Sequence, residues 1–168
     1  MIRTQHDPDP DLDLAFSRQV DLPPESIWAA WTQPELLMPW FCPKPWLTVA
    51  CEIDLQPGGA FRTVMRSPQG QEHPNVGCYL VVEPNRRLVW TNALAPGFRP
   101  VPVANVAQFF FFTGEISLAP DNGGTRYEAR VSHATRSDCD KHAAMGFEKG
   151  WGVALDQLVE FMQARQIR

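Results

Sequence analysis

Alternating apolar and polar residues predict seven short β-strands in this chain. The first covers 14–22. The others are bounded by segments rich in Gly, Pro or Asn, and they are predicted at 46–55, 60–66, 75–84, 88–94, 109–118 and 125–134. In 75–84, simple alternation places Val76, Cys78, Leu80 and Val82 on one face.

The hydrophobic period changes to that of a helix in two other regions. Residues 23–41 follow the first strand and contain an apolar stripe of Ile27, Trp28 and Trp31. Because Pro34 cannot continue a helix, this region predicts two short helices.

A longer helix is predicted at 145–162, close to the end of the chain. Its apolar face consists of Phe147, Trp151, Leu155, Leu158 and Met162. The same stretch contains Gly146, Gly150 and Gly152, and a glycine in a helix interior costs about 1 kcal/mol relative to alanine. Gly146 and Gly150 lie beside the apolar face, so either another backbone packs closely there or space is left open.

The order of these elements predicts an α+β fold. Successive strands with short turns form an antiparallel meander, and the last helix buries its apolar face against that sheet. The 168 residues suffice for one core, so we expect a single domain over 13–168. The acidic, Pro-rich segment 1–12 is predicted to be a disordered tail.

Composition narrows the class of protein. A net charge of −4 without a basic cluster argues against nucleic-acid binding. No apolar run reaches the roughly 20 residues of a membrane span, and no secretory signal is evident, so we expect a cytoplasmic protein. The four cysteines, at 42, 51, 78 and 139, lack C-x-x-C spacing and are expected to be reduced thiols.

Several segments together resemble a known family. They are VDLPPESIWAAWTQPELLMPWF, DLQPGGAFR, GCYLVVEPNRRLVWT, GGTRYEARVSH and the terminal GW with its spaced leucines. They cover about 14–162 and resemble the START/Bet v 1-like (SRPBCC) superfamily. Within it, the chain is similar to the group related to the C-terminal domain of the activator of the heat-shock protein 90 ATPase. That group often has an arginine where Gln56 stands, so no role of that arginine is transferred.

This resemblance implies a helix-grip fold, in which a curved antiparallel sheet of six to seven strands wraps the C-terminal helix and encloses an elongated cavity. Alternation from Ile116 and Leu118 places Phe110 and Phe112 on the inner face. The expected ligand-binding residues are mostly aromatic, and they are Trp40, Trp90, Asn92, Phe110, Phe112, Tyr127, His133, Phe147 and Trp151. Aromatic walls with a few polar groups are typical of a site for a small apolar ligand, although single aromatic residues at core spacing are more often only core residues.

Candidate chemistry is sparse. His133 and His142 are possible acid–base or metal-binding partners, but an interior histidine is more often a hydrogen-bonded core residue. Asp138 and Asp140 resemble helix-capping residues, and no metal-binding or cofactor motif is present. We therefore expect no catalytic residue, metal or cofactor.

The leading hypothesis is a noncatalytic protein that binds a small aromatic or lipid-like molecule between sheet and helix, with Asn92 and His133 orienting it. The first alternative is a cyclase- or hydrolase-like enzyme that uses His133 and Tyr127. The second alternative is a chaperone-associated partner protein, a function that fold similarity alone does not establish. Phe109 and Phe111 alternate with the inward rings, so they are predicted to face outward and to form a possible homodimer surface.

Overall fold

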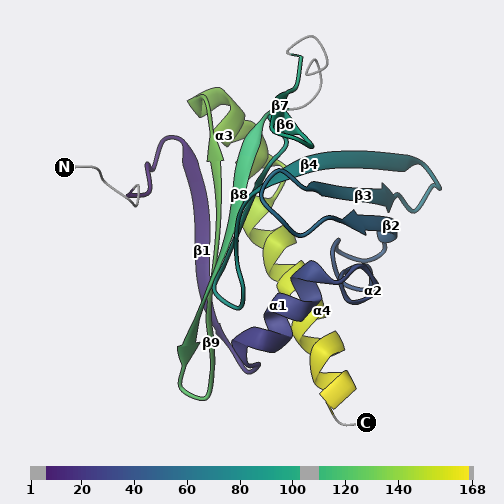
Figure 1. Cartoon of the computed structure of the whole chain (residues 1–168), viewed down its shortest axis with the longest axis vertical. Helices are drawn as coiled ribbons and strands as arrows, with labels where there is room; N and C mark the ends of the chain where they lie inside the picture. The colour runs from purple at the N-terminus through teal and green to yellow at the C-terminus, as the bar shows by residue number, and fades with distance from the viewer. Residues whose placement is uncertain (1–6, 103–109, 167–168) are drawn as a thin grey trace.

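The computed structural model describes residues 7–102 and 110–166, and it shows a curved antiparallel sheet around a long C-terminal helix (Figure 1). The sheet has seven strands in the order β1-β9-β8-β5-β4-β3-β2. Their bounds are β1 Asp13–Val20, β2 Leu47–Ile53, β3 Ala60–Arg66, β4 Glu72–Glu83, β5 Arg87–Thr91, β8 Phe112–Asp121 and β9 Gly124–His133. The predicted α+β class, meander and helix-grip arrangement are confirmed.

Four helices accompany the sheet in the described residues. They are α1 Pro24–Thr32, α2 Pro34–Leu37, α3 Arg136–Ala144 and α4 Phe147–Gln166. Pro24 and Pro34 stand in the first turns of α1 and α2, where a missing N–H costs nothing. The predicted pair of short helices after the first strand is thus confirmed.

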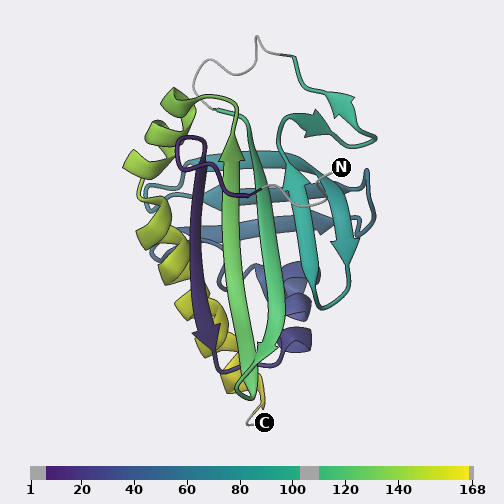
Figure 2. The ribbon, with the colours of Figure 1, turned by 90° about the vertical axis from the view of Figure 1, so that its left-hand side faces the viewer.

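Curvature of the sheet creates the interface that α4 covers. In Figure 1, β2, β3 and β4 run across the direction of β1, β8 and β9, while α4 passes along the inner side with α1 against it. Figure 2 shows the other side of the same sheet, with α4 running behind the edge strand β1. The core consists of residues from α1, α2, α4 and the inner face of the sheet, including Ile27, Trp31, Leu37, Trp40, Phe61, Tyr79, Leu88, Trp90, Ile116, Tyr127, Leu155 and Leu158.

A register shift in β4 overturns the simple alternation predicted there. The pairing of β4 with β5 slips between Tyr79 and Val81. As a result, Tyr79 is fully buried in the core and Val82, three residues on, packs against the same core. Cys78 is also buried but is not part of that cluster, and Leu80 is only half-buried. A bulge inserts an extra residue and so reverses the faces beyond it.

The predicted helix 145–162 begins two residues later than expected and follows a separate helix. Gly146 has φ +85° and lies between α3 and α4, so it is a turn residue and not a helix-interior glycine. A left-handed backbone conformation just after a helix favours glycine, because glycine has no Cβ that would clash in that conformation. The helix-interior cost therefore applies only to Gly150 and Gly152. The cap of α3 is Thr135, whose Oγ accepts the N–H of Asp138.

The predicted loop at 95–105 contains a small hairpin in its described part. Its strands are β6 Leu94–Ala95 and β7 Arg99–Pro100, and Gly97 between them has a positive φ. No described helix is long and apolar enough to cross a membrane.

The segment before β1 makes specific contacts where it is described. The amides of Leu12 and Asp13 donate to the carbonyl of Asp9, which closes a turn, and the carbonyl of Leu12 accepts the amide of His133. The predicted boundary of the tail at residue 12 stays a prediction, and residues 1–6 lie outside the described part. All four cysteines are free.

Candidate functional site

Aromatic rings line the interface between the sheet and α4 in an unbroken series. Ring centroids of Trp40 and Trp31 are 5.0 Å apart, those of Trp31 and Trp90 5.3 Å, and those of Trp90 and Trp151 6.4 Å. Phe147, one helical turn before Trp151, follows at 5.1 Å. Four rings are buried, whereas Trp151 is half-buried, so this indole lies where the series reaches the surface.

The series continues toward α3 through histidine rings. His142 lies 5.5 Å from Phe147, and it also contacts Phe110 and Phe112 at centroid distances of 4.8 and 5.3 Å. Both phenylalanines are half-buried, and Phe110 also contacts His133 at 5.6 Å. The interface thus joins seven of the nine predicted site residues: Trp40, Trp90, Phe110, Phe112, His133, Phe147 and Trp151.

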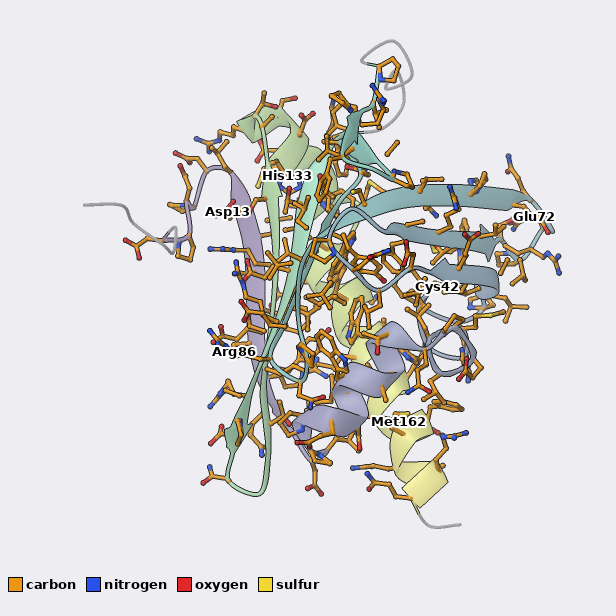
Figure 3. All side chains as sticks on the ribbon, viewed as in Figure 1. Asp13, Cys42, Glu72, Arg86, His133 and Met162 are labelled. Atoms are coloured by element: carbon orange, nitrogen blue, oxygen red, sulfur yellow. The ribbon has the colours of Figure 1, made fainter. Side chains whose placement is uncertain are left out.

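His133 and His142 form a buried pair at the α3 end of the sheet, where Figure 3 labels His133. Nε2 of His133 lies 2.9 Å from Nδ1 of His142, and Nδ1 of His133 lies 2.8 Å from the carbonyl oxygen of Leu12. A carbonyl only accepts, so Nδ1 of His133 carries a proton. When the His133 ring is neutral, its Nε2 is therefore an acceptor, and the Nδ1–H of His142 donates to this nitrogen.

Burial sets the protonation of this pair. Desolvation, reinforced by the nearby His133, lowers the pKa of His142 from 6.5 to about 4. His142 is therefore neutral at pH 7, and its Nε2 presents a lone pair. The sequence suggested both histidines but not their contact, because the connection from β9 to α3 that brings them together gives no periodic signal.

Asn92 binds the main chain of its neighbour. Its Nδ2 donates to the carbonyl of Phe110 at 3.2 Å, and its Oδ1 accepts the amide of Phe112 at 2.8 Å. Both amide atoms thus extend the pairing of β5 and β8 beyond the regular ladder, and they fix the two phenylalanine rings at the edge of the interface.

Tyr127 lies in a different part of the core from His133. It contacts Phe16 at a centroid distance of 6.1 Å, and burial raises the pKa of its hydroxyl. The two residues stand six apart on β9, which is about 20 Å along a strand. They cannot act on the same bond, so the acid–base pair of the first alternative is not assembled.

Two buried polar atoms in the aromatic region, Nε1 of Trp40 and the hydroxyl of Tyr79, lack a hydrogen-bond partner among the described residues, whereas the Trp31 indole lies against the Tyr127 hydroxyl. The sequence missed Trp31 and Tyr79 as site residues. The helical stripe containing Trp31 was a usable signal, whereas the bulge that turns Tyr79 inward was not visible.

Gly150, which is partly exposed, has open space beside it. A Cβ built on Gly150 meets no atom within 4 Å, whereas one on Gly152 meets the Arg18 guanidinium at 3.0 Å. Two residues apart on a helix, the glycines lie on opposite flanks. Gln157, one heptad after Gly150 and on its flank, donates through Nε2 to the carbonyl of Trp40 at 3.1 Å. The space therefore lies on the flank of α4 that faces the segment after α2.

Two surface pockets lie away from these rings. One of about 310 Å³ is lined by Cys42, Lys44, Trp46 and neighbours between α2 and β2, and another of about 430 Å³ adjoins Pro23 and Gln163. In residues 7–102 and 110–166, no group of three or more His, Cys, Asp or Glu side chains is placed to hold a metal ion.

The proposed dimer surface is only partly described. Phe109 lies outside the described residues, and Phe111 is half-buried. Dimerisation through these side chains stays a prediction.

Comparison with solved structures agrees with this fold. A crystal structure of a protein from Nitrosomonas europaea is 41% identical, with a TM-score of 0.89 over 95% of this chain and 99% of that one. A protein from Rhodobacter sphaeroides is 26% identical, with a TM-score of 0.78 over 95% and 98% of the two chains.

A third structure, of a protein from Aeromonas hydrophila, is 20% identical to this chain. Its TM-score is 0.66 over 94% of this chain and 96% of that one, which shows the shared fold.

No curated protein matches the chain. The model of one family, Activator of Hsp90 ATPase homolog 1-like protein, matches residues 21–163, which is most of the sequence. The chain therefore belongs to the Activator of Hsp90 ATPase homolog 1-like protein family.

Proposed function

We propose that this protein binds a small, flat, largely apolar molecule between the sheet and α4. The observation that supports this most directly is the half-buried Trp151 indole, which lies one residue from the open space at Gly150. A ligand entering there meets the rings of Trp90 and Phe147 on either side of Trp151.

Burial of apolar surface supplies the affinity. A two-ring aromatic molecule that buries about 250 Å² gains about 6 kcal/mol at 25 cal/mol per Å², equivalent to a dissociation constant of tens of micromolar. Phe110 and Phe112 add apolar surface at the α3 end, and Nε2 of His142 offers an acceptor there.

Tryptophan fluorescence tests this proposal. N-phenyl-1-naphthylamine, titrated into the protein, is expected to quench indole emission and to gain emission itself, because Trp151 and Trp90 lie at its site. Gly150→Leu fills the open space and is expected to weaken binding at least about tenfold. Lys149→Leu adds the same side chain at the neighbouring exposed position and serves as the matched control. Equal binding by all three proteins contradicts the proposed site.

Native mass spectrometry of freshly purified protein complements the titration. An endogenous ligand appears as a mass above that of the chain, and dissociation of the complex identifies it. The same spectrum reports whether the chain is a homodimer.

A second candidate function is acid–base catalysis by the histidine pair. The 2.9 Å contact between His133 and His142, with the Nε2 of His142 unbonded in the described residues, favours His142 as the base. Turnover of an ester or lactone that disappears in His142→Gln while the fold is kept supports it. The chaperone-associated role rests on the family description alone, and a pull-down with stimulated chaperone ATPase tests it.

A further inference from the structure

We propose that the surface pocket between α2 and β2 binds a small carboxylate with an apolar body, such as an arylalkanoic acid with one ring. The ammonium group of Lys44 pairs with the carboxylate, and the apolar lining of the pocket covers the ring. This site is separate from the one between the sheet and α4, so the inference goes beyond the proposed function and does not depend on it.

The pocket is formed by one continuous stretch of the chain. It measures about 310 Å³, and its lining residues all lie between Met38, directly after α2, and Val49 in β2. Figure 3 labels Cys42, which belongs to this stretch. The volume is at the lower end of the range for small-molecule sites, so it suits a one-ring ligand. None of these lining residues comes from α4, which distinguishes the pocket from the aromatic interface.

Most of the lining is apolar and open to solvent. Trp46 and Leu47 are 37% and 54% exposed, and the Trp46 ring lies against His73 at a centroid distance of 5.3 Å. Met38 and Pro39 contribute further apolar surface from the segment after α2. The apolar body of a ligand buries this surface together with its own, and that burial supplies the affinity.

Lys44 supplies a positive charge without a counterion. Its side chain is exposed and lines the pocket, and no carboxylate in the described residues forms an ion pair with it. Two ion pairs join the neighbouring strands β2, β3 and β4. They are Arg62–Glu52 at 2.9 Å and Arg66–Glu72 at 2.7 Å. These carboxylates are already paired, and Glu35 of α2 does not line the pocket, so an incoming carboxylate meets one free cation.

Thr48 supplies a hydrogen-bond donor at a more buried position. It is 7% exposed, and its hydroxyl lies 3.3 Å from Sγ of Cys42, with either atom able to donate. When the thiol donates, the hydroxyl proton of Thr48 is available to another acceptor. A carboxylate oxygen is a much stronger acceptor than sulfur, so a bound carboxylate favours this arrangement. Lys44 and Thr48 thus offer one donor for each carboxylate oxygen.

Gln157 of α4 holds the wall of the pocket in place. Its Nε2 donates to the carbonyls of Trp40 and Cys42 at 3.1 and 2.9 Å. Its Oε1 accepts the amide of Lys44 at 3.0 Å. One side chain therefore fixes both ends of 40–44, and a site that is ordered beforehand loses less entropy when a ligand binds.

Amide NMR of the full chain tests the inference. 3-Phenylpropanoate is titrated into ¹⁵N-labelled protein, and 3-phenylpropanamide serves as an uncharged compound of nearly the same shape. We expect the propanoate to shift the amide resonances of Thr48 and Val49 and the indole resonance of Trp46. We also expect it to bind about fivefold more tightly than the amide, as pairing with one exposed cation allows.

Lys44→Met removes the cation and keeps an unbranched side chain. We expect this variant to bind the propanoate about fivefold more weakly and the amide unchanged. Because the Lys44 side chain is exposed, the variant is expected to keep its fold, which its amide spectrum reports. Lys149→Met removes an exposed lysine from α4 and serves as the matched control, with binding of both compounds unchanged.

Each other outcome overturns the inference. If the amide binds as tightly as the propanoate, or if Lys44→Met keeps the preference, a carboxylate is not what the pocket recognises. If the shifts centre on Gly150 and Trp151, the compound occupies the other site. If no resonance moves at up to about 20 mM propanoate, the pocket does not bind this class. The titration with N-phenyl-1-naphthylamine tests the proposed function separately, so the two proposals fail independently.

Discussion

Nε2 of His133 lies 2.9 Å from Nδ1 of His142, and this contact joins the end of β9 to the last turn of α3. The same His133 ring binds the carbonyl of Leu12, so the segment before β1, which is distant in the sequence, meets β9 and α3 at two imidazoles. Because the second ring is neutral when folded, the contact depends on pH.

Folding stability is expected to fall between pH 6.5 and 4. In this window the unfolded chain binds a proton at His142, whereas the folded chain does not, because its pKa there is lowered to about 4. The free energy of unfolding therefore decreases as pH falls, by roughly 3 kcal/mol for this group, since one pKa unit corresponds to about 1.4 kcal/mol. Urea unfolding at several pH values measures it.

His142→Gln isolates this contribution from that of the carboxylates, which also titrate at low pH. Glutamine does not titrate, so the variant should be less dependent on pH between 6.5 and 4. An unchanged slope would show that His142 is not the responsible group.

Gly150→Ala is expected to keep or raise stability and to weaken ligand binding. The added methyl meets no atom within 4 Å and removes a helix-interior glycine, which is worth up to about 1 kcal/mol. Thermal unfolding and probe titration measure the two effects. A clear drop in the melting temperature with unchanged binding contradicts the open-space interpretation.

Gly114→Ala is expected to lower stability, in contrast to Gly150→Ala. A Cβ at Gly114 would lie 2.6 Å from the Trp90 indole, which crosses β8 at that residue. The ring has to shift, and such overpacking costs about 1–3 kcal/mol. A lower urea midpoint with an unchanged slope is expected, and a neutral result would show that the Trp90 ring moves freely.

Tyr79→Phe removes only an unpartnered hydroxyl. Since the buried group gains no hydrogen bond from the described residues, its loss is expected to raise the free energy of unfolding by about 1 kcal/mol. Denaturant unfolding of the two proteins measures whether the free energy of unfolding rises or falls. Destabilisation of similar size would mean that the hydroxyl has a partner in solution, such as a bound water.

All four cysteines are expected to react with a thiol reagent after denaturation without prior reduction. In the folded protein the reaction should be slow, because three thiols are buried and desolvation raises the pKa of the half-buried Cys51 to about 11. Labelling followed by mass spectrometry counts the thiols, and recovery of only two would reveal a disulfide.

Local patterns were sufficient to place several of the candidate residues on the buried side of their elements. The four-residue spacing of Phe147 and Trp151 predicted one helical face, and alternation from Ile116 predicted that Phe112 would point toward the helix. Contacts of these rings with Trp90 and His142 agree with both predictions. Such patterns report which side of an element is buried, and burial repeats with the period of the element.

The sequence by itself determined the order of the seven sheet strands, the two short helices and the long C-terminal helix, the fold class and most of the apolar faces, because each depends on residues close together in the chain. Only the tertiary structure decided that Tyr79 turns inward, that Gly146 separates two helices and that His133 meets His142. These features depend on a register shift, a left-handed turn and the curvature of the sheet. Each departs from the regular period of a strand or helix, so no local period records that geometry.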